Sequence, residues 1–449
     1  MKKIFQYIML AVVTIVMASC TSDIEETTTT AGKSNVQLVV GEFPAFGDSQ
    51  TRAIGTPDEG KTSWAVGDEL LLEIDNTSYG RHNATFTYNG KSWELTSGEL
   101  VYLEGDPAYI PHVYYAPNYK WEAGELFLKK GKVAGTDEYI EGKARITGNG
   151  ETITVSFSEA TRKYSRLRIA TLPNEQITVD TEYFTPAGSS DMEQNGNYTL
   201  TSDEKGNAYL YGTFENNSEV TVKYREAALT TYTFSQATES AKSYALDATV
   251  ISANSAEEIK TAIEQKVADG KTTIRLNLAP NAGTNEFMAI REAIKGAAPN
   301  DLGTIELTFI GVETIPEEAF YKMLQLKSVR MSDVKEIKKY AFKECQYLTV
   351  VEAPSLNKLC SGAFKKCDQL AKLTFGPINY ADERNWPIFE YITPNIDLIL
   401  SDYQKEMIET DSYLYTANND RDYAGSDEHN SKNFLGREFR SITCRYKVK

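Results

Sequence analysis

Self-similarity at a period of 22 residues constrains the fold of this 449-residue chain more than any other feature of its sequence. Residues 312–333, 334–355 and 356–377 align without a gap, and their apolar residues fall into shared columns. The columns contain Val312, Val334 and Leu356; Ile315, Ile337 and Leu359; Phe320, Phe342 and Phe364; Leu326, Leu348 and Leu370; and Val329, Val351 and Leu373. A repeat this short cannot bury its apolar residues alone, so the period predicts a stack of repeats around one continuous core.

The aligned repeats share the pattern L-x2-L-x-L-x2-V-x2-I-x3-A-F-x2-C-x2-L, which resembles the BspA-like leucine-rich repeat. Each repeat offers a short strand, such as residues 328–331, and strands of neighbouring repeats are expected to pair in parallel about 4.8 Å apart. The resemblance implies a solenoid that presents an extended binding surface, as in proteins that bind host matrix proteins or other bacteria.

The segment before the repeats has the features of a capping unit. The run from Ser255 to Glu258 is a capping box, and it predicts a helix that Gly270 ends. Helical spacing of apolar residues predicts a second helix over residues 286–295. Residues 274–278 and 305–310 are predicted strands.

The segment after the repeats departs from their register. Trp386 follows Phe364 by 22 residues and is predicted to continue the aromatic column. Residues 396–400 are predicted to form the last strand, and residues 401–449 are expected to cover the open end of the stack. The tail from 434 to 442 resembles a pair of terminal strands.

The cysteines of the repeats are predicted to be core residues. Cys345 and Cys367 share a column with Met323, which is typical of small buried hydrophobic positions. A disulfide between them is the alternative. Cys360 falls in an outward-facing column, and a bridge from it to Cys444 is left open. Without any C-x-x-C spacing, these cysteines predict no disulfide framework for a chain of this length.

The N-terminal half has the alternating pattern of β-strands. Short apolar-polar segments recur between residues 35 and 250, and Asn89-Gly90, Asn149-Gly150 and Asn195-Gly196 are hairpin-type turns between them. This pattern is typical of β-sandwiches. The length predicts two of them, over residues 35–165 and 166–250.

A local motif adds a second family resemblance. Thr51-Arg52-Ala53 precedes Trp64-Ala65-Val66-Gly67-Asp68 and an apolar strand at 70–74, as at the entry to fimbrillin-like domains. The resemblance implies a pilus subunit or a surface lipoprotein, with Arg52 as a possible proteolytic maturation site. A plain loop arginine is the alternative. Polymerising fimbrillins donate a C-terminal strand, but repeats occupy that end here, which favours an accessory or tip subunit.

The N-terminus has the layout of a secretory signal peptide. Lys2 and Lys3 precede an apolar stretch over residues 4–17, and Met17-Ala18-Ser19-Cys20 follows. These residues resemble the lipobox of bacterial lipoproteins, which implies lipidation of Cys20 after removal of residues 1–19. An ordinary signal peptide is the alternative. Residues 20–34 are predicted to be a flexible tether whose acidic residues resemble a surface-export signal, so the chain is expected on the outer membrane, facing the exterior.

Several kinds of chemistry are not expected. A net charge of -16 argues against nucleic acid as a partner. Residues 55–62 match G-x4-G-K-T, but no strand leads into this segment and no helix is predicted after it. The three histidines have no metal-ligand spacing. The sequence predicts no metal, no cofactor and no enzymatic activity, although a carboxylate pair in an unseen cleft stays possible.

The solenoid offers the candidate ligand contacts. Residues between two buried columns of a strand point outward, so one exposed sheet face is expected to carry Arg330, Glu352, Lys372 and Thr374. The alternative is that Arg330 and Glu352 only pair with each other. Residues 312–377 contain 11 Lys or Arg against 8 Asp or Glu, and several lysines cluster toward the turns: Lys338, Lys339, Lys343, Lys365 and Lys366. Such a cluster could attract anionic glycans or an acidic partner, or only keep the solenoid soluble.

The sequence therefore predicts a multidomain protein, with N-terminal all-β sandwiches and a C-terminal leucine-rich repeat solenoid of short parallel strands and helical caps. The predicted parts of the solenoid are a cap at 251–311, repeats at 312–377, and a final repeat and cap at 378–449. The predicted function is binding of a host or bacterial surface protein or glycan. An accessory or tip subunit of a fimbria and a glycan-handling protein are the alternatives.

Overall fold

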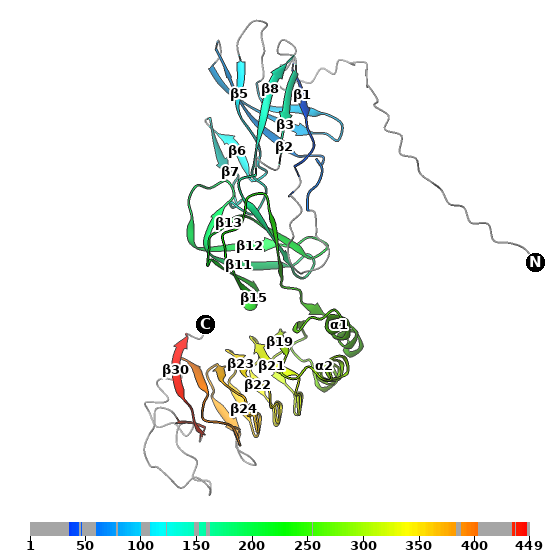
Figure 1. Cartoon of the computed structure of the whole chain (residues 1–449), viewed down its shortest axis with the longest axis vertical. Helices are drawn as coiled ribbons and strands as arrows, with labels where there is room; N and C mark the ends of the chain where they lie inside the picture. Colours follow the sequence, from blue (N-terminus) through cyan, green and yellow to red (C-terminus); the bar gives the residue numbers. More distant parts are fainter. Residues whose placement is uncertain are drawn as a thin grey trace, which may run out of the picture.

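The computed structural model describes residues 36–44, 46, 60–77, 80–99, 108–122, 124–147, 152–158, 162–253, 255–382, 388–402, 433–435 and 437–446. The predicted signal peptide, the tether, Cys20, Arg52 and Trp386 lie outside these residues. The described part of the chain is mostly β-strand with two helices, and its sheets form successive modules along the chain (Figure 1). Neither of these helices is long and apolar enough to cross a membrane.

The first module is a seven-stranded sheet. Its order is β1 (Gln37–Val40), β9 (Thr152–Ser156), β8 (Ile140–Thr147), β5 (Ala108–Tyr115), β2 (Glu69–Asn76), β3 (Gly80–Tyr88) and β4 (Trp93–Gly98). A separate hairpin joins β6 (Tyr119–Glu122) to β7 (Glu125–Leu128). Strands β1 and β4 contact each other although they end the order, and Leu38 and Phe86 share one core. A single curled sheet therefore replaces the two separate sheets that a sandwich implies.

The Trp64–Asp68 motif forms the turn that leads into β2. The Asp68 carboxylate accepts a hydrogen bond from the Ala65 amide at 2.7 Å. The Trp64 ring packs edge-on against Trp93 and Tyr115, so the motif anchors the module's core. Lys61, the lysine of the G-x4-G-K-T pattern, binds Asp68 at 2.5 Å, and β2 rather than a helix follows. Lys61 therefore contributes to the structure of the turn.

The second module is also one seven-stranded sheet. The order is β15 (Ala227–Thr233), β14 (Glu219–Tyr224), β11 (Gln176–Pro186), β13 (Asn207–Phe214), β10 (Ser165–Ala170) and β16 (Ser243–Asp247), with β12 (Glu193–Thr201) paired to β11. Strand β11 exchanges neighbours near Tyr183, whose φ is 49°. Residues before this bend pair with β14, and residues after it pair with β13. One bent strand thus wraps the sheet around a single core.

The third module contains two parallel ladders of repeats. The long ladder is β17 (Ile251–Ser252), β18 (Thr273–Asn277), β19 (Ile305–Ile310), β21 (Leu326–Met331), β23 (Val350–Ala353), β25 (Lys372–Phe375), β27 (Asp397–Ser401) and β30 (Ser441–Tyr446). The short ladder is β20 (Thr314–Ile315), β22 (Glu336–Ile337), β24 (Lys358–Cys360) and β26 (Tyr380–Asp382). Val329 pairs with Val351 and Val351 with Leu373, which confirms the 22-residue register.

Stacked aromatic rings run through the core of the repeats. Phe320 and Phe342 lie 5.3 Å apart between ring centroids, and Phe342 and Phe364 lie 5.4 Å apart with nearly parallel planes. All three rings are fully buried. The column continues at Phe389, 5.8 Å from Phe364, so the prediction that Trp386 takes this place is wrong. An insertion before Phe389 breaks the spacing on which that prediction rested.

The four cysteines that the structure describes form no disulfides. Cys345 and Cys367 are fully buried, and their S–H groups donate to the carbonyls of Phe320 and Phe342, each at 3.0 Å. Cys360 and Cys444 are half-buried and form no disulfide. The two disulfide alternatives are therefore wrong, and the prediction of buried core thiols is confirmed.

The two ends of the array differ from the repeats between them. Helix α1 (Ala256–Ala268) begins at Ser255, whose hydroxyl accepts from the Glu258 amide, and α2 (Thr284–Ala297) packs Phe287 against Phe320. At the other end β27 is followed in the sheet by β30, which corrects the prediction that residues 396–400 form the last strand. Strand β28 (Asn433–Phe434) pairs antiparallel with β29 (Arg437–Glu438), and Phe434 of this pair and Phe439, which follows it, are buried in the core of the repeats.

Replacing the central ring of the stack should destabilise the whole array. We expect Phe342→Ala to lower the free energy of unfolding by about 3–5 kcal/mol, because neighbouring rings cannot close the cavity. Tyr391→Ala removes an aromatic ring that is 63% exposed and should cost less than about 0.5 kcal/mol. Urea unfolding followed by circular dichroism measures both, and a loss below 1 kcal/mol for Phe342→Ala would contradict the stacked core.

The buried thiols should be protected in the folded protein. Burial raises the pKa of Cys345 to about 12, and it also raises the pKa of Cys367. Because the thiolate is the reactive form, we expect iodoacetamide to modify these two cysteines only after unfolding. Peptide mass spectrometry of native and denatured protein tests this. Rapid modification of either thiol in the native state would show that the array opens.

Candidate ligand-binding face

The outer face of the long ladder is built by strand alternation. Val329 and Met331 are fully buried, so Arg330 between them points to the opposite face of the sheet. Parallel pairing then aligns one residue from each strand in a single outward column. In chain order this column contains Arg275, Thr308, Arg330, Glu352, Thr374 and Ile399.

The predicted contact residues come together on this face. Glu352 lies one rung from Arg330 and one rung from Lys372. Its carboxylate accepts a hydrogen bond from Arg330 Nε at 3.1 Å and lies 3.7 Å from Lys372 Nζ. Thr374 pairs with Glu352 in the ladder. The predicted Arg330–Glu352 pair is therefore confirmed, while the second cation on Glu352 was not foreseen.

This cluster is partly exposed and carries a net positive charge. The side chains of Arg330 and Lys372 are 42% and 46% exposed, and that of Glu352 is 30% exposed. Two cations share one carboxylate, so one positive charge remains uncompensated within the triad. Exposed ion pairs of this kind contribute only about 0–1 kcal/mol to stability. Arg330 and Lys372 can thus exchange Glu352 for an acceptor on a ligand at a small cost in stability.

The first two rungs of the outward column are closed by the second module. Arg275 and Thr308 are only 5% and 2% exposed. Arg275 Nε donates to the Leu229 carbonyl of β15 at 2.6 Å, and Ile310 of β19 belongs to the core of the second module. Figure 1 shows β15 next to the start of the repeat sheet. The accessible face therefore begins at Arg330.

Asp247 supports the same junction. Its carboxylate accepts hydrogen bonds from the Thr249 hydroxyl at 2.6 Å and the Thr249 amide at 2.9 Å, and it lies 3.9 Å from Arg275. Burial opposes its ionisation, but these hydrogen bonds, with Lys266 and Arg275 nearby, hold the pKa of Asp247 below its ordinary value. Sequence reasoning missed this junction because nothing periodic links β15 and β16 to the cap.

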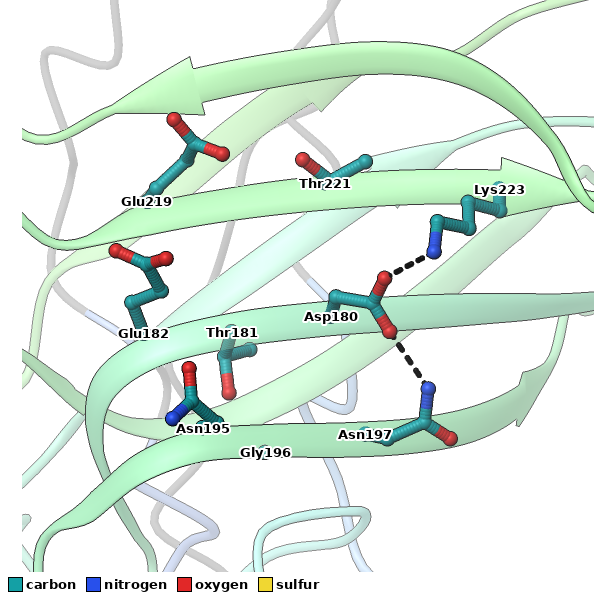
Figure 2. Close-up of a pocket in the computed structure, with 9 residues that line it drawn as sticks. All are labelled: Asp180, Thr181, Glu182, Asn195, Gly196, Asn197, Glu219, Thr221 and Lys223. Atoms are coloured by element: carbon teal, nitrogen blue, oxygen red, sulfur yellow. Dashed lines mark hydrogen bonds and ion pairs between the residues drawn. The ribbon is translucent and has the colours of Figure 1, made fainter. Parts of the chain in front are cut away.

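A polar hollow of about 480 Å³ lies on the second module (Figure 2). Figure 2 shows Asp180 bound on both sides, to Lys223 and to Asn197, on neighbouring strands. Glu182 and Glu219 are the other carboxylates in its lining. The hollow is an open sheet surface. The alternative of a catalytic carboxylate pair would place that pair in this hollow. The lining adds no further group for catalysis.

The comparisons with known proteins agree with the repeat geometry. Residues 301–405 match the family model for the BspA type leucine rich repeat region, in six copies. None of the curated proteins compared with this chain matches it. The match confirms the predicted repeat and extends it to the rungs on both sides of residues 312–377. The two N-terminal modules lie outside it and are characterised by their sheets alone.

The junction should weaken in acid. Because the folded-state pKa of Asp247 is depressed, its contribution is present above the unfolded pKa of about 4 and is lost as pH falls through the folded value. We expect Asp247→Asn to cost about 1–2 kcal/mol at pH 7 and much less near pH 3. Urea unfolding at both pH values measures this. Glu182→Gln, an exposed carboxylate of the same module, is the control, and a pH-independent loss for Asp247→Asn would contradict the assignment.

Proposed function

We propose that this protein is a surface-displayed binding protein, and that its ligand contacts the outer sheet face from Arg330 to Thr374. The observation that carries the proposal is the excess cation of the Arg330–Glu352–Lys372 triad on an otherwise open face. A protein or glycan that presents carboxylate or sulfate groups beside hydroxyls would satisfy Arg330, Lys372 and Thr374 together. The BspA-type repeat supports such a role, since it is an adhesin-type repeat.

The proposal includes display at the cell surface. Lipidation at Cys20 would hold the chain on the outer membrane, and the acidic residues after it favour export to the exterior. The two β-rich modules would then separate the repeats from the membrane. We propose no enzymatic activity, cofactor or metal, and no nucleic-acid partner.

The fimbrial alternative rests on different residues. The Trp64–Asp68 motif leads into β2 of the first module and resembles the entry to fimbrillin-like domains, which would make the chain an accessory or tip subunit. In that case the protein would travel with surface fibres sheared from the cell. As a stand-alone adhesin it would remain with the membrane fraction.

The binding face can be tested on an array of matrix proteins and glycans probed with the full chain. We expect the combined variant R330A, E352A, K372A, T374A to bind its strongest array ligand at least about tenfold more weakly, a loss of about 1.4 kcal/mol. A control variant, E313A, K335A, K358A, removes the same net charge from residues in or next to the short ladder and should stay within about twofold.

Two outcomes would exclude this face. In the first, both variants bind as the unchanged protein does. In the second, both lose affinity equally, which would assign the effect to net charge. Circular dichroism and thermal unfolding of each variant separate loss of contacts from loss of fold.

A further inference from the structure

A third ladder joins the turns of the repeats, on an edge separate from the outer sheet face. The Phe320 amide donates to the Ala341 carbonyl at 2.8 Å, and the Phe342 amide donates to the Ala363 carbonyl at 2.9 Å. Lys322 bonds to Lys343 in the same way at 2.9 Å. Backbone pairing therefore fixes the turn residues of neighbouring repeats beside one another. Their side chains form columns that project from this edge.

These columns bring lysines and tyrosines together. Lys343 Nζ lies over two rings, 5.0 Å from the centroid of Tyr321 and 4.6 Å from that of Tyr340. Lys339 lies over Tyr340 at 4.7 Å, and Lys322 lies over Tyr321 at 5.1 Å. The rings limit the freedom of the lysine side chains without neutralising them. The ammonium groups are thus held in place and stay positively charged.

Helix α2 extends the same edge. Arg291 donates to the Glu318 carbonyl at 3.0 Å, which places the helix beside the first turn. Burial, together with the charges of Arg291 and Lys322, holds the pKa of Lys295 below its ordinary value. We use the name basic edge for the following set: Arg291, Lys295, Lys322, Lys339, Lys343, Lys365 and Lys366.

Acidic side chains only partly compensate this charge. Glu344 lies 3.6 Å from Lys322 and 3.9 Å from Lys343, and Glu390 pairs with Lys365 at 2.5 Å. Glu317 and Glu318 are exposed beside the first turn. Among the residues that the structure describes, Lys339 and Lys366 form no ion pair with a carboxylate. The edge therefore keeps a local positive charge in a chain whose net charge is -16.

We propose that the basic edge binds a linear anionic polysaccharide carrying sulfate or uronate groups. Its rungs lie about 4.8 Å apart, and three consecutive rungs carry first Lys322, then Lys339 and Lys343, then Lys365 and Lys366, so the edge matches a polymer whose charges recur at short intervals. A flat edge suits an extended chain better than a compact acidic domain, which would need a concave surface or an apolar centre. The site goes beyond the outer sheet face and does not depend on it.

The overall charge makes the test selective. Long-range repulsion by a chain of -16 opposes any polyanion, so binding at physiological salt requires a local, uncompensated cluster. The probes are heparin, neutral dextran and polyglutamate, each titrated into the full chain at about 150 mM salt, where the screening length is about 8 Å.

We expect heparin to bind, dextran not to bind, and polyglutamate to bind more weakly than heparin. The variant K322Q, K339Q, K343Q should bind heparin at least about tenfold more weakly. The control K327Q, K335Q, K358Q removes the same charge from lysines that pair with Glu306, Glu313 and Glu336, and it should stay within about twofold. Lys343→Arg keeps the charge over both rings and should retain affinity.

Three results would overturn the proposal. One is absence of heparin binding at 150 mM and at low salt. Another is equal loss in the two triple variants, which would assign binding to net charge alone. The third is tighter binding of polyglutamate than of heparin, which would replace the polysaccharide with an acidic peptide. The outer-face variant R330A, E352A, K372A, T374A should leave heparin binding unchanged, so the two sites are tested separately.

Discussion

Parallel backbone pairing at a constant spacing of 22 residues is the constraint on which the repeat module depends. It places each residue beside its counterpart in the next repeat. The backbone register alone therefore brings the rings of Phe320, Phe342 and Phe364 into a stack. The pairing also maintains conformations that an isolated residue avoids. Glu318 and Tyr340, one rung apart, both have φ near 55°, which costs about 1–2 kcal/mol each in a non-glycine residue. Ladder hydrogen bonds and burial of the adjacent rings offset this cost on these two rungs, and the next rung has Gly362 at the same position.

The same register determines the surface. Like charges on neighbouring rungs would repel, and the outer face avoids this because Glu352 contacts both Arg330 and Lys372, which lies in the adjacent column. On the turn edge the arrangement is different, because tyrosine rings lie between the lysines and the ion pairs formed by Glu344 and Glu390 compensate only part of the charge. Among the described residues, the outer-face triad thus keeps one excess cation, whereas the turn edge keeps two lysines, Lys339 and Lys366, that form no ion pair with a carboxylate. The distinction follows from which residue types occupy two columns of the same repeat.

Sequence reasoning could predict what periodicity carries and little beyond it. The apolar columns and the Arg330–Glu352 pair follow from counting in steps of 22, and both cap helices follow from a capping motif or from the helical spacing of apolar residues. Phe389 follows Phe364 by 25 residues, so the same counting pointed to Trp386 instead. Strand β30 joins β27 across a long intervening segment without a repeat signal. In the N-terminal half, alternation predicts strands. It cannot show that a bend at Tyr183 lets β11 pair first with β14 and then with β13, so that one sheet surrounds the core.

The junction between the second module and the cap restricts how the repeats can move when a force or a ligand acts on them. Arg275 is bound to the Leu229 carbonyl and lies beside Asp247, and Ile310 enters the core of the second module. These contacts bury polar and apolar groups together, so the repeats are attached through a packed interface that includes the first rungs of the sheet. Motion of the cap relative to the β module would expose the Arg275 guanidinium and Ile310 at once, and the desolvated pairing makes that costly. Rungs from Arg330 onward are therefore presented by a fixed support, and a ligand there meets a surface already ordered before binding.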